Sequence, residues 1–149
     1  MSNQRKIEPL NPAERDWVTE ELGNAQRLVK QFSPVDEGAR MTPGVLDRVF
    51  KQAYESNPND SDHGNAVINA VGIAFGQYLV DELGYEWVMV TDEHGCEIAV
   101  VALPGTANVL VFPPNLVAKR WVSGTTDFLW YVYQGIEEDL VMFRQERHQ

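Results

Sequence analysis

Three short β-type runs joined by very short links constrain the fold more than any other feature of the sequence. Residues 85–91, 97–103 and 108–112 are rich in β-branched and aromatic side chains, which favour strands. Turn-forming residues fill the links, with Asp92–Gly95 in the first and Pro104–Ala107 in the second. A parallel return needs roughly a dozen residues or more, so the three strands form an antiparallel meander.

Helical patterns flank this meander on both sides. The sequence predicts a helix over about residues 12–32, begun by a capping box of Asn11 and Glu14, and a second from the cap Thr42 to about residue 56. A third helix, capped by Asp60 or Asp62, runs to about Leu83 before Gly84. A short helix ending near Val122 and a last helix follow the strands. Thr126 or Asp127 is expected to cap the last helix, because small polar residues favour that position. The prediction is an α+β fold, a three-stranded antiparallel β-meander packed against helices in the order α-α-α-β-β-β-α-α.

The helix over residues 61–83 is apolar around most of its surface, which is typical of a central helix. Gly72 and Gly76 share one of its faces and would let another element approach closely. In the first strand, either Trp87 with its alternating neighbours or Val88 with Val90 points toward the helices. We favour the valines, with Trp87 on a half-covered face.

Length and composition indicate one domain over residues 1–149. It divides into a polar lead at 1–10 that can be disordered, a helical extension at 11–60 and an α+β core at 61–147. Cys96 is the only cysteine, so no disulfide forms within the chain. The longest apolar run, Ile98–Leu103, is far too short to span a membrane, and no secretory leader is recognisable, so we expect a cytoplasmic protein.

Charge excludes some classes of partner. The chain has 12 Lys and Arg against 22 Asp and Glu, a net charge of −10, and no Lys or Arg lies between Lys51 and Lys119. A protein that binds nucleic acid or an anionic membrane needs cationic groups on its surface, so both kinds of partner are disfavoured. The interval is typical of a solvated acidic surface, and the sharper alternative is a docking face for a basic protein.

The carboxy-terminal half carries a family resemblance. It combines VGIAFGQYLVDELGYEW at residues 71–87, the turn DEHG, a strand ending in VFP, the triplet KRW at 119–121 and Asp127. In these features the chain resembles the bacterial family of the domain of unknown function DUF3806, over roughly residues 62–145. The resemblance implies no activity, cofactor or catalytic residue, and it leaves the helices before residue 60 outside.

Motifs for catalysis and metal binding are missing. The chain has no phosphate-binding glycine loop and no nucleophile elbow, and Asp60, Asp62 and His63 do not fit the spacing of a calcium loop. His63, His94 and His148 have no His or Cys at helical metal-ligand spacing. We therefore predict no metal, cofactor or catalytic residue.

His94 and Cys96 form the tightest group of reactive side chains. A nearby histidine can activate a thiol, which would make this pair the centre of an enzyme of unrecognised type. Side chains in a hairpin turn usually point apart into water, so a plain polar turn is the favoured interpretation.

Three functional hypotheses remain, in descending order. The first is a non-catalytic interaction module with an acidic surface for a basic protein or a second copy of the chain. The second is a domain that binds a small ligand between sheet and helices, and the third is the enzyme at His94 and Cys96. The aromatic cluster at residues 128–133 is either buried or part of such a surface. The candidate binding surface comprises Trp87, Asp92, His94, Lys119, Arg120 and Trp130.

Overall fold

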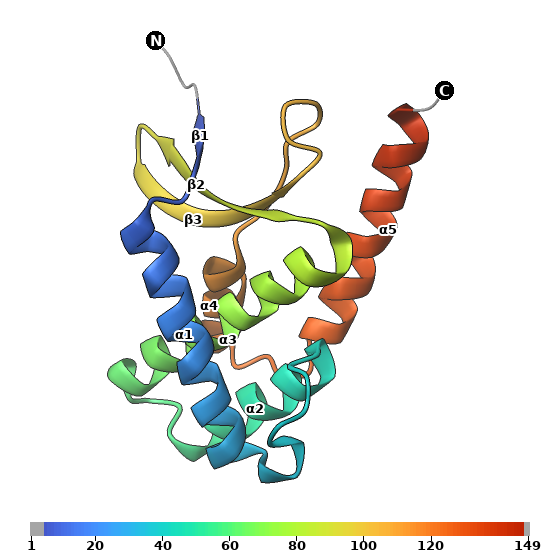
Figure 1. Cartoon of the computed structure of the whole chain (residues 1–149). Coiled ribbons are helices and arrows are strands. Elements are labelled where there is room, and N and C mark those ends of the chain that lie inside the picture. The colour runs from blue at the N-terminus through green and yellow to red at the C-terminus, as the bar shows by residue number, and fades with distance from the viewer. Residues whose placement is uncertain (1–4, 148–149) are drawn as a thin grey trace.

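The protein has the predicted α+β architecture, as shown by a computed structural model that describes residues 5–147 (Figure 1). A single 3₁₀ turn, η1, follows the first helix. In chain order the elements are β1 (Lys6–Pro9), α1 (Pro12–Phe32), η1 (Pro34–Asp36), α2 (Pro43–Ser56), α3 (Ser61–Leu83), β2 (Glu86–Asp92), β3 (Gly95–Ala102), β4 (Val109–Val111), α4 (Pro113–Ser123) and α5 (Leu129–Arg147).

The sheet is antiparallel with strand order β1-β2-β3-β4, so the predicted meander is confirmed. The additional strand, β1, comes from the segment that the sequence predicts to be a polar lead. Ile7 lies opposite Val90, and Leu10 is buried. A four-residue edge strand with one apolar side chain has too little alternation to be recognised in the sequence. Residues 1–4 lie outside the described residues.

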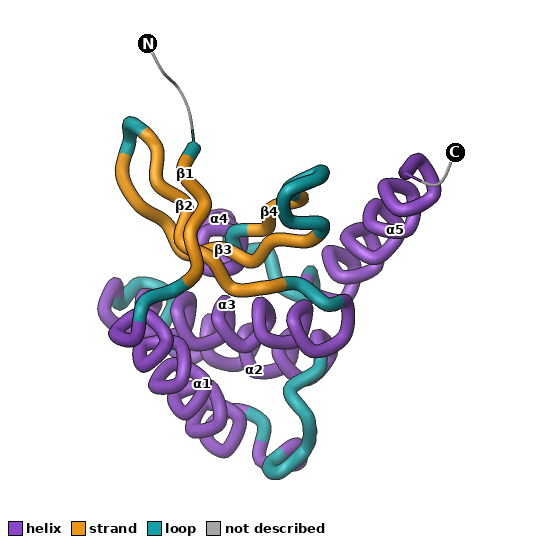
Figure 2. Tube along the Cα trace, turned by 45° about the horizontal axis from the view of Figure 1, so that its top comes forward, coloured by secondary structure: helices purple, strands orange, loops and turns teal. Residues whose placement is uncertain are grey.

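The two faces of β2 are oriented opposite to our expectation. Trp87 and Met89 point toward α3 and α1, whereas Val88 and Val90 pack on the other face of the sheet with Ile7 and other apolar side chains. The reason lies in α3, because its glycines leave space for an indole ring that a face with larger side chains would not hold. Figure 2 shows the strands together on one side of α1, α2 and α3.

The glycines of α3 work as close-packing positions. A Cβ atom on Gly72 would lie 2.7 Å from the Cα of Pro114, and one on Gly76 would lie 2.5 Å from the Trp87 ring. A Cβ on Gly64 would meet the Trp121 ring at 2.8 Å. These separations are shorter than a carbon–carbon contact of about 3.5–4.0 Å. At these three positions α3 must therefore lack a side chain for α4 and β2 to pack this closely on it.

Most helix ends follow the predicted capping residues. Asn11 and Glu14 form a capping box, Thr42 caps α2, and Asp60 caps α3. The start of α5 differs, because neither Thr126 nor Asp127 caps it. Asp47 of α2 accepts hydrogen bonds from the backbone N–H groups of three residues there, at 3.1, 2.8 and 3.0 Å.

The helix α5 projects beyond the rest of the molecule. Its first half packs on the core through Leu129 and Tyr133, and its end extends past the other helices beside the sheet (Figures 1 and 2). Leu140 is accordingly still buried, while Phe143, three residues further along, is 40% exposed. No helix within residues 5–147 is long and apolar enough to cross a membrane.

Candidate functional site

A row of aromatic rings crosses the surface from α3 to α5, and we call Tyr78, Tyr133 and Trp130 the aromatic row. The Tyr78 and Tyr133 rings meet at a tilt with centroids 5.2 Å apart, and Trp130 stacks on Tyr133 at 6.3 Å. Tyr133 is buried, whereas Trp130 is 47% exposed. Such spacings are within the range of attractive aromatic pairs, so the row is an ordered feature of the surface.

One end of the row already holds a cation. The guanidinium carbon of Arg40 lies 4.9 Å from the centre of the Tyr78 ring, and the same guanidinium pairs with Glu82. A cation within about 6 Å of a ring centre is attracted by the electrons of its face. Arg40 comes from the segment between α1 and α2, so it ties that segment to α3.

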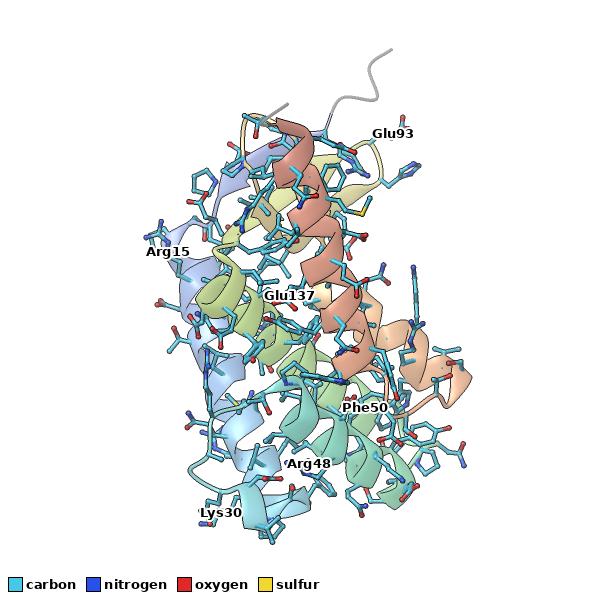
Figure 3. All side chains as sticks on the ribbon, turned by 90° about the vertical axis from the view of Figure 1, so that its right-hand side faces the viewer. Arg15, Lys30, Arg48, Phe50, Glu93 and Glu137 are labelled. Atoms are coloured by element: carbon cyan, nitrogen blue, oxygen red, sulfur yellow. The ribbon has the colours of Figure 1, made fainter. Side chains whose placement is uncertain are left out.

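Carboxylates border the row. Burial raises the pKa of Tyr78, and the nearby Glu82 carboxylate adds to the rise. Burial raises the pKa of Tyr133 too, with Glu137 as the next cause. Glu137 is exposed and lies in the middle of α5 (Figure 3). Both tyrosines therefore lie in a negative field, the kind that favours a cation on the rings.

The position of α5 depends on Asp47. This carboxylate is 7% exposed and satisfies three N–H groups at the start of α5, which places Trp130 in the first turn. Burial raises the pKa of Asp47, and the three backbone hydrogen bonds oppose that rise. Asp127 has a φ of 59°, a left-handed conformation in which it does not cap the helix.

A cleft of about 730 Å³ opens beside Tyr78 and Arg40. Its walls come from α1, from residues 37–41 and from α3. The hypothesis of a ligand pocket near Trp87, Lys119 and Arg120 placed such a cavity between sheet and helices, whereas this cleft lies between helices. Its basic side chains are Arg27, Lys30 and Arg40.

The structure distributes the predicted binding residues over separate places. Trp87 is largely packed on α3, where its indole N–H donates to the side-chain oxygen of Gln77 at 2.9 Å. Arg120 lies over the Phe128 ring at 5.5 Å. Trp130 lies at the start of α5, far from the β2–β3 hairpin that carries Asp92 and His94.

Asp92 and Lys119 are related through Glu97. Burial and the Asp92 charge raise the pKa of Glu97, and Lys119 lowers it in opposition. These three side chains therefore share one region toward the turn end of the hairpin, which does not include Trp130. The six predicted residues do not form one continuous surface.

His94 and Cys96 adopt the arrangement of a polar turn. The backbone N–H of His94 donates to Asp92, and the His94 ring lies 3.5 Å from Glu93. The Cys96 sulfur lies 3.3 Å from the hydroxyl of Thr91, and both His94 and Cys96 are exposed. No cluster of three or more metal-ligating side chains occurs in the part of the chain that the structure describes. His148 lies outside those residues.

The aromatic cluster at residues 128–133 is divided between the two alternatives. Phe128 and Tyr133 are buried, while Trp130 and Tyr131 are 47% and 71% exposed. Sequence reasoning identified Trp130 but missed Tyr78, Arg40 and Glu137. Only Glu137 had a usable signal, since it follows Trp130 by seven residues and so lies on the same side of a helix.

Comparison with known proteins gives a family match and a structural likeness. A family model described as "Domain of unknown function (DUF3806)" matches residues 45–133. A crystal structure from Bacteroides thetaiotaomicron VPI-5482 has a TM-score of 0.68 at 16% identity, over 93% of this chain and 49% of that chain. This chain thus spans about half the length of that protein, and at such low identity the likeness concerns the fold alone. No curated protein matches the sequence.

Proposed function

We propose that this chain, which belongs to the DUF3806 family of unknown function, is a non-catalytic binding domain that docks a basic segment of a protein partner on its α3–α5 surface. The family match confirms the resemblance expected from the sequence. Its bounds differ, because the match begins at residue 45 and so includes most of α2. Tyr78, Glu82, Trp130 and Tyr133 lie inside the matched region, and Glu137 lies just beyond it.

The observation that carries the proposal is the position of Arg40. This arginine stacks on Tyr78 and pairs with Glu82, so the surface holds one guanidinium between a ring and a carboxylate. Arginine is well suited to this arrangement because its planar group stacks on rings and donates several hydrogen bonds at once. An arginine from a partner would find the same two kinds of group further along the row.

The second position is formed by Trp130 and Glu137. They are seven residues apart on α5, close to two helical turns, so both project from the same side of the helix. Trp130 leaves 47% of its surface in contact with solvent, and Glu137 is exposed and in no ion pair within residues 5–147. Tryptophan offers the strongest cation-binding face among the aromatic side chains.

The negative charge of the protein also favours a basic partner at long range. The chain has a net charge of −10, and the described surface near the row includes Asp81, Glu82 and Glu137. Such a field accelerates the encounter with a basic partner and weakens as salt screens it. A docked arginine would then be held by short-range contacts with the ring and the carboxylate.

Fluorescence anisotropy with a labelled Arg-Gly repeat peptide tests the proposal. A cation–aromatic contact at an exposed site contributes about 0.5–1 kcal/mol, so Trp130→Ala should weaken binding by about two- to fivefold. Glu137→Gln should weaken it too. A Gln-Gly repeat peptide of equal length should bind far more weakly, because it lacks the cations.

Neighbouring residues provide matched controls. Tyr131→Ala removes a ring that is 71% exposed and points about 100° away from Trp130 around the helix. Glu138→Gln removes the same charge as Glu137→Gln from a different side of α5. If each control weakens peptide binding as much as its partner variant, the attraction is only that of net charge and general surface, and the proposal is wrong.

A further inference from the structure

We propose that the cleft between α1, residues 37–41 and α3 is a binding site for an anionic small molecule that carries an apolar group. This proposal goes beyond the docking of a protein partner, although the cleft adjoins the aromatic row and shares Tyr78 and Arg40 with that surface. Its volume of about 730 Å³ falls within the range of about 300–1,000 Å³ typical of small-molecule pockets.

The charge of the cleft differs from that of the chain as a whole. Its lining holds three cations (Arg27, Lys30 and Arg40) and two carboxylates (Glu37 and Asp81). Because Arg40 is paired with Glu82 outside the lining, the charges left to a ligand balance, in a chain of −10. The cleft therefore lacks the acidic excess of the rest of the chain, which is consistent with an anionic group placed against Arg27 and Lys30.

Two of these cations are available to a ligand. Arg27 and Lys30 are three residues apart on α1, so both project from the same side of the helix. Neither makes an ion pair with a described residue, and the guanidinium of Arg27 donates to the neutral side-chain oxygen of Asn24. Arg40, in contrast, is already paired with Glu82.

Apolar side chains supply the other half of the site. Leu22 and Val29 of α1 face Ala74 of α3 across the cleft, and Met41 contributes from the connecting segment. All four belong to the main core cluster or pack against it. Methionine adapts its shape to irregular ligands, so the lining suits an apolar group of varied outline.

Gly23 keeps the cleft open. Glycine inside a helix costs roughly 1 kcal/mol relative to alanine. A Cβ atom at Gly64, Gly72 or Gly76 would clash, which explains those residues, whereas a Cβ at Gly23 would meet no atom within 4 Å. Packing therefore does not require a glycine at this position. Gly23 does line the cleft, where any side chain would occupy ligand space.

The connecting segment is held in place before any ligand arrives. Arg48 of α2 donates to both carboxylate oxygens of Asp36, at 2.9 and 3.0 Å. These bonds, with one from the Ser33 hydroxyl, hold the pKa of Asp36 below its usual value. Figure 3 shows Arg48 and Lys30 in the same end of the molecule. A fixed wall lowers the ordering cost of binding.

Anilinonaphthalene sulfonate, an anionic aromatic dye, is a suitable probe, with uncharged phenylnaphthylamine as its neutral counterpart. Calorimetric titration of the full chain should show tighter binding of the sulfonate. Charge-assisted hydrogen bonds are roughly twice as strong as neutral ones, so Lys30→Gln or Arg27→Gln should each weaken sulfonate binding about tenfold, which corresponds to about 1.4 kcal/mol. The same changes should leave the neutral compound almost unaffected.

Two further variants locate the site. Gly23→Leu should abolish binding of both compounds without lowering the melting temperature, because leucine fills the cleft and is a better helix former than glycine. Arg15→Gln removes a cation from the opposite end of α1 and should change nothing (Figure 3). Equal binding of both compounds, or sulfonate binding that survives Gly23→Leu or ignores both cation variants, overturns the proposal. The aromatic-row variants do not enter this test, so the two proposals fail separately.

Discussion

The cap that Asp47 provides for α5 leads to a quantitative prediction. Asp47→Ala removes the acceptor of three backbone N–H groups, of which those of Phe128 and Leu129 are buried. Each hydrogen bond to a charged group contributes about 1.5–3 kcal/mol, and loss of an N-cap alone costs about 0.5–2 kcal/mol. Removing a buried charge offsets part of the loss. We expect the free energy of unfolding to fall by about 3 kcal/mol.

In a chain of this size, that loss corresponds to a fall in melting temperature of roughly 6–12 °C. Urea unfolding followed by circular dichroism measures the free energy directly. Asp47→Asn keeps one acceptor oxygen and should lose less than Asp47→Ala. A loss below about 0.5 kcal/mol for Asp47→Ala, the usual range of a surface substitution, would show that Asp47 does not hold α5.

The contribution of Asp47 to stability should change with pH in a definite direction. Burial raises the pKa of Asp47 in the folded protein above its ordinary value of 3.8. The stabilisation that comes from this shift is therefore complete below pH 3.8 and is lost as the pH rises through the folded-state pKa. Asp47→Asn does not titrate, so its stability relative to the natural protein should improve from acid to neutral pH. An opposite trend would contradict the assigned direction.

Four further outcomes are expected. Gly76→Ala should destabilise the protein by about 1–3 kcal/mol in urea unfolding, because its Cβ overlaps the Trp87 ring. Gly23→Ala, with free space around its Cβ, should stabilise it by up to about 1 kcal/mol in the same assay. Tyr85→Phe should leave the melting temperature unchanged or raise it, since the buried Tyr85 hydroxyl has no hydrogen-bond partner among the described residues and burial raises its pKa to about 12. Cys96 should react with a thiol reagent at the rate of a free exposed cysteine, unchanged by His94→Ala; a faster reaction of the natural protein that slows in His94→Ala would contradict this and indicate an activated thiol at the turn.

Most of the fold was predictable from patterns within a few neighbouring residues of the sequence. The short links fixed the antiparallel meander, and Asn11, Thr42 and Gly84 marked helix ends that the structure retains. Gly72 and Gly76 indicated close packing on α3 because glycine in a helix interior needs a reason. In each case the physical cause lies within a few residues of the signal.

Features that depend on residues far apart along the chain could not be predicted from the sequence. Asp47 caps a helix more than eighty residues further along the chain, at a sequence separation of 83 for the Trp130 bond. The strand β1 pairs with β2 although three helices separate them in the chain, and it leaves little pattern of its own. The orientation of Trp87 was predicted wrongly because alternation gives two faces but does not say which one meets the helices.

The candidate site was predictable only in part for the same reason. Trp130 was one of the predicted binding residues, within an aromatic cluster whose burial the sequence left open, and the structure leaves it 47% exposed. Tyr78 and Arg40 became relevant only when three segments of the chain came together. The cleft has walls from separate elements and therefore has no local sequence pattern.

Amide chemical-shift mapping of the nitrogen-labelled protein tests the binding surface most directly. Titration with the Arg-Gly repeat peptide should move signals of the first half of α5, around Trp130 and Glu137, and of α3 around Tyr78 and Glu82. The shifts should decrease as salt is added. If the peptide instead moves only the acidic hairpin around Asp92 and Glu93, or the start of α3 around Asp62, the aromatic row is not the docking site and the proposed function is wrong.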